Sequence, residues 1–267
     1  MPTARYKTTI NASFDRVSEL LADKVEKPRK YVGVVVHSKI LERGDGYVIR
    51  EMLQAMPVQL TVREKIYEKD VPGGRDFVFE HIDNARYTGF FHNILTRVEG
   101  REDHVELEYF MDWRPHPGTQ DDMPEAAAQQ LVKQGVEHMK EIAEHPVVVP
   151  DWVRAFFDAA DSLDADALEP LLADDMRFRV GNNPEVVGKG NVIEASRGVT
   201  QVFSAMQHDY VGVYTDNNRA FADCFVDYTA LNGDKYLIPF LTMLEQENGK
   251  ISSVVAYGDM SPVRHGW

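Results

Sequence analysis

The sequence predicts two α+β domains in tandem, the first at residues 1–145 and the second at residues 151–267. About six β-like segments lie between residues 32 and 113, and a long helical pattern follows them. A seam with two prolines, EHPVVVPDW, then interrupts the chain. Beyond the seam helices come first and strands last, without the alternation of a βα fold, and this order is typical of a second α+β domain.

Composition excludes several classes of partner. The 267 residues are enough for two modest domains, and 43% hydrophobic residues can form their cores. The formal net charge of −14 repels phosphate backbones and anionic lipid headgroups, so we expect neither nucleic acid nor a membrane as partner. No signal peptide or spanning segment stands out in the sequence, and we expect a cytoplasmic protein.

The first domain is predicted to be a meander closed by a long helix. A strand at residues 5–10 leads into a helix with Asn11 or Ser13 as its N-cap. Turn signals such as Gly44-Asp45-Gly46 and Pro72-Gly73-Gly74 separate the six strands that follow. The closing helix is predicted at 124–144, where apolar residues recur at helical spacing.

The second domain is predicted to place its helices before its sheet. Pro146 and Pro150 each prevent a helix from running through the seam. We expect helices at 152–162, 167–172 and 191–206, and strands at 176–180, 209–214, 219–230, 235–246 and 251–259.

Motifs for cofactors and metals are missing. The sequence contains no dinucleotide-binding glycine motif, no P-loop, no H-E-x-x-H and no nucleophile elbow. Nine histidines form no short-spaced metal pair. The single cysteine, Cys224, lies in an apolar alternation and is predicted to be a buried thiol. We therefore expect no cofactor and no metal.

The second half resembles the SnoaL-like branch of the nuclear transport factor 2-like superfamily, which contains polyketide cyclases and steroid isomerases. The resemblance rests on WVRAFFDAADSLDADALEPLLADDMRF, on VVGKGNVIEA and on NGKISSVVAYGD. It implies a cone-shaped α+β barrel with a mostly apolar cavity. Because members include isomerases, cyclases, dehydratases, epoxide hydrolases and binding modules, the fold alone does not give the function.

The first half resembles the START-like or SRPBCC superfamily, whose helix-grip fold wraps an antiparallel sheet around a long C-terminal helix. Its order of elements and the segments GYVIREM, VREKIYE and FHNILTRVE carry the resemblance. The resemblance implies a second small-molecule pocket, toward which His81 is predicted to point as a substrate-binding residue. The alternative is that His81, like Arg50 and Glu51, belongs to a surface pair.

The steroid-isomerase triad is absent. The resemblance places Phe156, Val180 and Thr242 at the positions of that triad, and none of them has the residue type that the chemistry needs. We predict instead that the three line the substrate pocket. By strand parity, Tyr228 and Phe240 belong to apolar rows that are predicted to line the same pocket or to form the core.

His208 falls where dehydratase-like members carry a histidine. A neutral imidazole suits a general base near neutral pH. Its expected partner position falls near Phe156, so the pair is incomplete unless Asp158, Asp161 or a strand carboxylate substitutes. The alternative is a histidine at the start of a strand that caps a helix or faces solvent.

The last predicted strand offers a second candidate base. SnoaL-like cyclases place an acid there, and Asp259 is the only carboxylate in ISSVVAYGDMS. It would have to be partly desolvated to act as a base. Tyr257 lies on the same face by period two and could donate to an enolate oxygen. The alternatives are a turn residue for Asp259 and a core residue for Tyr257.

Three functions remain open. The first is a cofactor-independent cyclase, isomerase or lyase that acts on a polyketide-like or other carbonyl-rich small molecule in a biosynthetic pathway. The second is a non-catalytic small-molecule binding or carrier protein. In the third, one domain is catalytic and the other serves as a dimer surface or lid. The resemblance of the second half also implies a homodimer.

Overall fold

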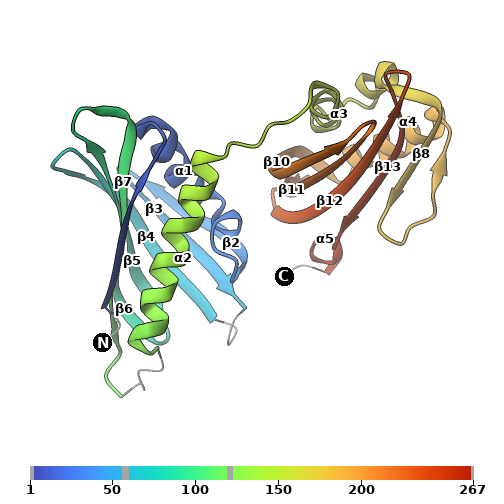
Figure 1. Cartoon of the computed structure of the whole chain (residues 1–267). Helices are drawn as coiled ribbons and strands as arrows, with labels where there is room; N and C mark the ends of the chain where they lie inside the picture. Colours follow the sequence, from blue (N-terminus) through green and yellow to red (C-terminus); the bar gives the residue numbers. More distant parts are fainter. Residues whose placement is uncertain (1–2, 56–59, 119–122, 266–267) are drawn as a thin grey trace. The chain divides into compact units, whose positions relative to one another are not determined.

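The computed structural model describes residues 3–55, 60–118 and 123–265. The chain divides into two compact units, Met1–Pro146 (unit 1) and Val147–Trp267 (unit 2), each with its own sheet (Figure 1). Both units combine helices with a sheet, so the predicted α+β class is confirmed.

Unit 1 contains a seven-stranded antiparallel sheet with the strand order β1-β7-β6-β5-β4-β3-β2. The first strand pairs with the last, so the predicted six-strand meander gains a seventh member. The elements are β1 (Thr3–Ile10), α1 (Phe14–Glu26), a 3-10 turn (Pro28–Lys30), β2 (Val35–Gly44), β3 (Tyr47–Gln54), β4 (Leu60–Val71), β5 (Gly74–Asn84), β6 (Tyr87–Val98), β7 (Arg101–Pro115) and α2 (Glu125–Glu144).

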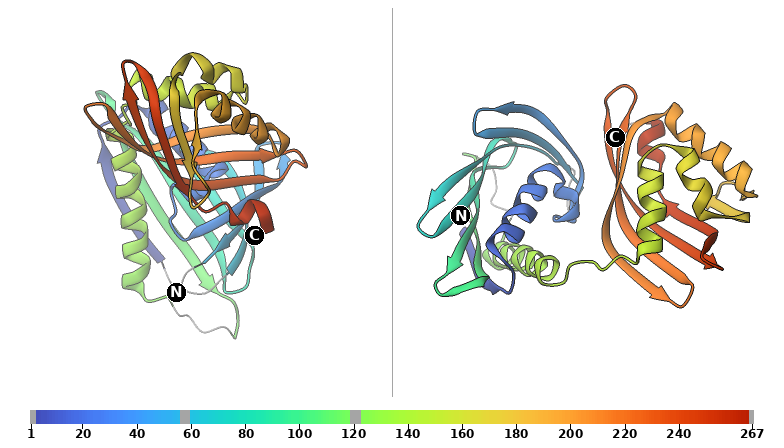
Figure 2. Two further views of the ribbon diagram at one scale, coloured as in Figure 1. Left: turned by 90° about the vertical axis from the view of Figure 1, so that its right-hand side faces the viewer. Right: turned by 90° about the horizontal axis from the view of Figure 1, so that it is seen from above.

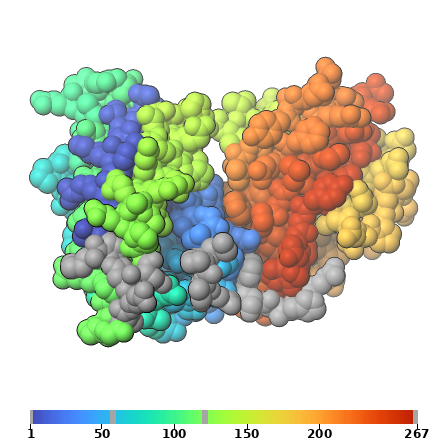
Figure 3. All heavy atoms as spheres, turned by 60° about the horizontal axis from the view of Figure 1, so that its bottom comes forward, coloured from blue at the N-terminus to red at the C-terminus, as the bar shows by residue number. Residues whose placement is uncertain are grey.

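Both helices of unit 1 pack on one face of the sheet (Figure 2). Helix α1 begins after Ser13, whose hydroxyl accepts a hydrogen bond from the backbone N–H of Arg16 at 3.2 Å. Helix α2 packs along β1, and Figure 3 shows its yellow-green atoms beside blue atoms of the N-terminal segment. Its buried stripe of Ala128, Val132, Val136, Met139 and Ala143 joins the side chains of α1 and the sheet in one core.

Unit 2 contains a six-stranded mixed sheet with the strand order β10-β11-β12-β13-β8-β9. Strands β13 and β8 pair in parallel and the other neighbours pair antiparallel. The elements are α3 (Asp151–Asp161), a 3-10 helix (Ala165–Leu171), β8 (Leu172–Val180), β9 (Val186–Val187), α4 (Lys189–Arg197), a 3-10 turn (Gly198–Gln201), β10 (Phe203–Asp216), β11 (Arg219–Ala230), β12 (Lys235–Glu247), β13 (Lys250–Gly258) and α5 (Ser261–His265).

The helix predicted at 191–206 is wrong in its second half. Helix α4 ends at Arg197, and β10 begins at Phe203. The segment after Gly198 contains the β-branched residues Val199, Thr200 and Val202, which lower helix propensity. Pairing with β11 then extends the strand. His208 therefore lies inside a strand and not at its start.

Helices α3 and α4 pack on one face of the sheet of unit 2, and the side chains between these layers form its core (Figure 2). The inward rows of β11 and β12 alternate with outward residues, as the sequence predicted. No helix within the described ranges is long and apolar enough to cross a membrane.

Candidate active site

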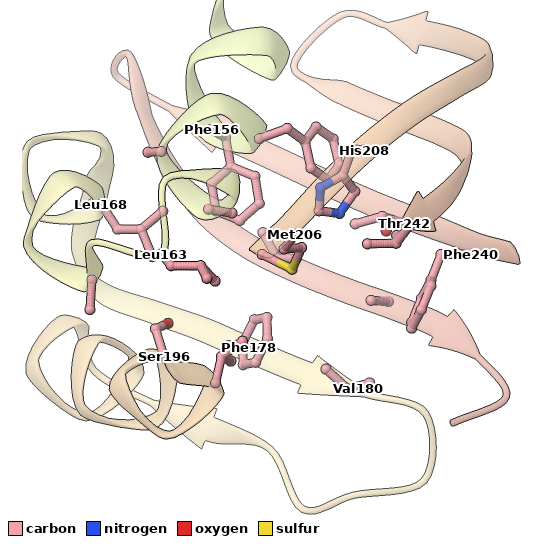
Figure 4. Close-up of a pocket in the computed structure, with 18 of the residues that line it drawn as sticks. Phe156, Leu163, Leu168, Phe178, Val180, Ser196, Met206, His208, Phe240 and Thr242 are labelled. Atoms are coloured by element: carbon pink, nitrogen blue, oxygen red, sulfur yellow. The ribbon is translucent and has the colours of Figure 1, made fainter. Parts of the chain in front are cut away.

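Unit 2 encloses an apolar cavity of about 240 Å³ between its helices and the inner face of its sheet. Figure 4 shows side chains from α3, β8, β10 and β12 converging on it. The wall is formed by Phe156, Phe157, Ala159, Ala160, Leu163, Asp164, Ala165, Leu168, Phe178, Val180, Val192, Ser196, Val199, Phe203, Met206, His208, Val226, Tyr228, Phe240, Thr242, Val254, Ala256 and Met260. A cavity of this kind suits a small apolar molecule with few polar groups.

Strand parity determines which side chains face the cavity. On β11, Val226 and Tyr228 point inward, and on β12, Phe240 and Thr242 do so. Gly258 leaves room beside Phe240, because a Cβ there would lie 2.5 Å from its ring. The sheet therefore supplies an ordered wall on which two hydroxyl groups and one imidazole stand among apolar neighbours.

His208 and Asp161 form a pair at the wall of the cavity. The Nδ1 atom of His208 lies 2.5 Å from Oδ1 of Asp161, and the backbone N–H of His208 donates to Oδ2 at 2.8 Å. The ring of Phe157 covers the imidazole, with ring centroids 4.4 Å apart. Both oxygens of one carboxylate thus contact one histidine, one through its ring and one through its backbone, and these contacts orient the imidazole.

This arrangement fixes the role of each imidazole nitrogen. An ionised carboxylate only accepts hydrogen bonds, so Nδ1 of His208 carries the proton that faces Asp161. In the neutral ring Nε2 is then the acceptor, and it is the nitrogen available to a molecule in the cavity. The same logic operates wherever a carboxylate orients a histidine base and stabilises the imidazolium that forms.

The position of Asp161 opposes helix stability. It is the last residue of α3, where the negative end of the helix dipole disfavours a carboxylate. The side chain is partly buried and its two oxygens are occupied by His208. A carboxylate at this position is therefore explained by its partner and not by the helix.

Two hydroxyl groups add hydrogen-bonding capacity to the wall. Burial raises the pKa of Tyr228, which keeps its hydroxyl protonated and able to donate. Its ring packs on Phe203 with centroids 4.4 Å apart. Thr242 lines the cavity from the next strand. The hydroxyl of Ser196 already donates to the carbonyl of Val192 at 2.9 Å, so its proton is committed.

The cavity brings together six of the nine residues predicted as site residues. They are Phe156, Val180, His208, Tyr228, Phe240 and Thr242. His81 lies in unit 1, on the inner face of its sheet beside Trp113. It takes no part in this cavity.

Tyr257 and Asp259 need correction, because the geometry argues against their predicted roles. On β13, Val254 and Ala256 face the cavity, so the alternation turns Tyr257 outward, where it is 44% exposed and accepts from Arg179 at 3.0 Å. Asp259 lies past the end of β13, fully exposed, and accepts from the backbone N–H of Ser261 at 2.9 Å. These hydrogen bonds lower the pKa of Asp259, which makes it a weaker base.

The sequence left the partner of His208 open among several carboxylates, and the structure selects Asp161. The two residues are 47 positions apart, one at a helix end and one within a strand, so no local pattern joins them. Asp158 is one helical turn earlier and exposed. Met206 was not predicted as a lining residue, because its segment was assigned to a helix. Among the described residues, no group of three or more His, Cys, Asp or Glu side chains could hold a metal ion.

A family model matches part of unit 2. Residues 153–254 match the SnoaL-like domain, so this part of the chain is similar to that family. No curated protein matched the chain.

The solved structures similar to this chain each cover less than half of it. A hypothetical protein with a ketosteroid isomerase-like fold from Catenulispora acidiphila, in complex with trimethylamine, is 16% identical, with a TM-score of 0.41 over 43% of this chain and 91% of that chain. A candidate SnoaL-like polyketide cyclase from Jannaschia is 13% identical, with a TM-score of 0.40 over 43% and 88%. An LEH-like epoxide hydrolase from M. tuberculosis is 16% identical, with a TM-score of 0.38 over 43% and 85%.

Proposed function

We propose that unit 2 is a cofactor-independent acid–base enzyme, a cyclase, isomerase or lyase that acts on a polyketide-like or other carbonyl-rich small molecule. The observation that carries the proposal is the hydrogen-bonded pair of His208 and Asp161 at the wall of an apolar cavity. The SnoaL-like match supports the class, because that family contains cofactor-independent cyclases and isomerases.

In the proposed reaction, Nε2 of His208 removes a proton from a carbon next to a carbonyl group. The electron pair of the C–H bond moves into the carbonyl and forms an enolate, while Asp161 stabilises the imidazolium. The hydroxyl groups of Tyr228 and Thr242, two residues that line the same cavity, donate to the developing oxyanion in this proposal. The apolar wall excludes water and strengthens these interactions.

The fate of the enolate separates the three reaction types. Return of the proton from the imidazolium to a different carbon gives isomerisation. Delivery of that proton to a departing hydroxyl group gives elimination and releases water. Attack of the enolate carbon on a second carbonyl forms a ring, and the imidazolium then protonates the new alkoxide. All three begin with the same step, so one assay tests them together.

Proton abstraction is measured by hydrogen–deuterium exchange of a bicyclic ketone, 2-tetralone, in D₂O at neutral pH. We expect the protein to accelerate loss of the α-proton NMR signals above the buffer rate. His208→Asn should reduce this acceleration at least tenfold, since a positioned general base contributes about 10²- to 10⁴-fold. Asp161→Asn should also reduce it at least tenfold, because an amide NH₂ facing Nδ1 favours the tautomer that protonates Nε2.

Asp158→Asn is the matched control, since it removes an exposed carboxylate one turn earlier on α3. It should leave the exchange rate within about twofold of the wild type, as expected for a surface change. Exchange at the buffer rate, or equal exchange by the wild type and His208→Asn, would overturn the proposal.

The second candidate function is a small-molecule binding module. It is favoured by the cavity itself, whose wall is almost entirely apolar and which has Phe156, Val180 and Thr242 at the positions of the steroid-isomerase triad. It predicts saturable binding of 2-tetralone that survives His208→Asn, without accelerated exchange. The resemblance of unit 1 to START-like domains remains a proposal, and it would add a second binding module to the chain.

A further inference from the structure

A row of polar side chains crosses the inner face of the sheet in unit 1. Arg50, Glu64, His81 and Trp113 occupy successive strands in register, with Gly89 between the last two. Because Gly89 has no side chain, the ring of Trp113 reaches His81, with centroids 4.8 Å apart. Interiors of small domains are normally apolar, so a polar row at this position requires a reason.

Part of this row serves the fold. One nitrogen of Arg50 donates to the carbonyl groups of Lys24 and Val25 at 2.9 and 2.8 Å, at the end of α1. The other terminal nitrogen donates to Glu64 at 2.7 Å. The guanidinium thus satisfies carbonyl groups at the helix C-terminus and is neutralised by a buried carboxylate. These contacts explain why Arg50 and Glu64 are buried in the interior of unit 1.

The burial of Lys24 is not explained by contacts of this kind. Its Nζ atom is buried, donates to Oδ1 of Asn93 at 2.8 Å and lies over the ring of Tyr109 at 4.2 Å. The rings of Phe79 and Phe91 lie 5.4 and 5.5 Å away. Within the described part of the chain, no carboxylate forms an ion pair with Lys24, although Glu64 is close enough to act on it electrostatically.

The buried N–H groups of this interior also lack acceptors. Nδ2 of Asn93, Nε1 of Trp113 and Nε of Arg50 have no hydrogen-bond partner among the described residues. All three residues have inward parity. The unpartnered carboxylate oxygen of Asp76 and the carboxylate of Glu108, which pairs with Arg5 at 2.8 Å, belong to residues of the opposite parity. The inner face therefore has an excess of donors, and what is missing there is an acceptor.

Stability alone does not explain Lys24. Burial, followed by the charge of Arg50, lowers the pKa of Lys24 to about 7, which reflects the cost of keeping an ammonium group in this environment. A methionine of similar length would fill the same space without that cost. The aromatic rings around Nζ attract a cation but leave its remaining protons without an oxygen acceptor.

We propose that the inner face of unit 1 binds an organic anion, a carboxylate on an aromatic or other apolar body, whose oxygens accept hydrogen bonds from Nζ of Lys24 and Nδ2 of Asn93. The two donors are adjacent, because Nζ already contacts the oxygen of the same amide group. The rings of Phe79 and Phe91 lie within 5.5 Å of Nζ of Lys24, and Phe91 contacts Trp113, so the apolar body of the ligand would lie against these rings. This binding site is separate from the cavity of unit 2.

The probes are 2-naphthoate and its neutral analogue 2-naphthamide, titrated by calorimetry into the full chain at about pH 6.5, where Lys24 is mostly protonated. Unit 2 could bind either naphthyl compound, so the informative quantity is the ratio of their dissociation constants. We expect the wild type to prefer naphthoate at least tenfold, about the contribution of one charge-assisted hydrogen bond. Lys24→Met should reduce this preference to about twofold or less, because it removes the charge and keeps the volume.

Two further variants complete the test. Lys39→Met removes an exposed lysine of β2 in the same unit and should preserve the preference. Asn93→Leu retains the charge and removes the second donor, and it should weaken naphthoate binding by at least about threefold. His208→Asn should leave the ratio unchanged, which separates this site from the proposed activity of unit 2. Absence of saturable naphthoate binding, or a preference that persists in Lys24→Met, overturns the proposal.

Discussion

Lys24 and Asp161 are two charged side chains that oppose the stability of the elements that carry them. Lys24 is an ammonium group buried among aromatic rings, and Asp161 is a carboxylate at the C-terminal end of a helix. Natural sequences depart from local rules mainly at functional sites. In each unit the residue that departs from the rules lies in the proposed site.

The burial of Lys24 predicts a pH-dependent stability difference between the wild type and Lys24→Met. The folded state loses the lysine proton near pH 7, whereas the unfolded state keeps it until about pH 10.5. Below pH 7 Lys24 is charged in both the folded and the unfolded state. The wild type then bears the full cost of burying the charge, and Lys24→Met is more stable by that amount. Above pH 7 the wild-type free energy of unfolding rises relative to the variant by roughly 1.4 kcal/mol per pH unit.

Calorimetry of both proteins at about pH 6.5 and about pH 9.5 measures this difference. Lys24→Met should unfold at the higher temperature in both conditions, with a smaller gap at the higher pH. Arg50, Glu64 and Tyr109 lie near Lys24, and His81 lies beside Glu64. All four are present in both proteins, so their own contributions largely cancel in the difference. A gap that grows with pH would contradict the buried, deprotonating lysine.

At the scale of elements, the sequence predicted alternating strands well and the boundary of one helix badly. Strand β11 spans the predicted residues. Strand β12 differs from the prediction by one residue at its end and β13 by one residue at each end, because inward and outward alternation is a local signal. The segment that begins at Phe203 was assigned to a helix. Its strand is defined by hydrogen bonds to β11, and these are not local.

The two candidate sites differ in how far the sequence predicted them. The inward rows of β11 and β12 follow from parity, so several lining residues were identified before the structure. Asp161 could not be chosen as the partner of His208 from the sequence, because the end of its helix approaches a strand that is distant in the chain. Lys24 was not predicted because a lysine in an amphipathic helix is normally exposed. The sequence did not show which face of β13 is turned to the cavity. In the structure Val254 and Ala256 face it, so Tyr257 points outward.

The glycine between His81 and Trp113 predicts a large effect on the sheet of unit 1. Gly89 has a φ of 125°, and a Cβ there would lie 2.0 Å from the carbonyl oxygen of Asp112 on β7. Since this neighbour is backbone, it cannot yield without disturbing the β6–β7 pairing. Gly89→Ala should therefore lower the free energy of unfolding by more than about 2 kcal/mol.

Gly46→Ala is the comparison for this change. Gly46 lies in the turn between β2 and β3 with a φ of 72°, and a Cβ there would meet no atom within 4 Å. It should cost only about 1 kcal/mol, the strain of the backbone conformation itself. Urea unfolding of the two variants measures both values. Equal losses would show that close approach to β7 contributes nothing.

At the scale of the whole molecule, the two units have separate cores and chemically different interiors. The core of unit 1 and the two core clusters of unit 2 share no residue. Unit 1 has an inner face rich in buried donors, and unit 2 has an apolar cavity with a His–Asp pair. We therefore propose that the two units bind different chemical classes. The expected homodimer and cytoplasmic location stay predictions.

Division of the chain between Pro146 and Val147 tests whether the units work independently. Among the residues that the structure describes, no core cluster crosses this point, so residues 1–146 and 147–267 should each fold and unfold cooperatively. The preference for 2-naphthoate over 2-naphthamide should remain with residues 1–146, and 2-tetralone exchange with residues 147–267, each within about threefold of the intact chain. The intact chain carrying Lys24→Met is the control for exchange, which it should not change. A folded 147–267 fragment that has lost exchange activity, when the intact chain shows it, would mean that catalysis needs unit 1 and that the two interiors act on one substrate.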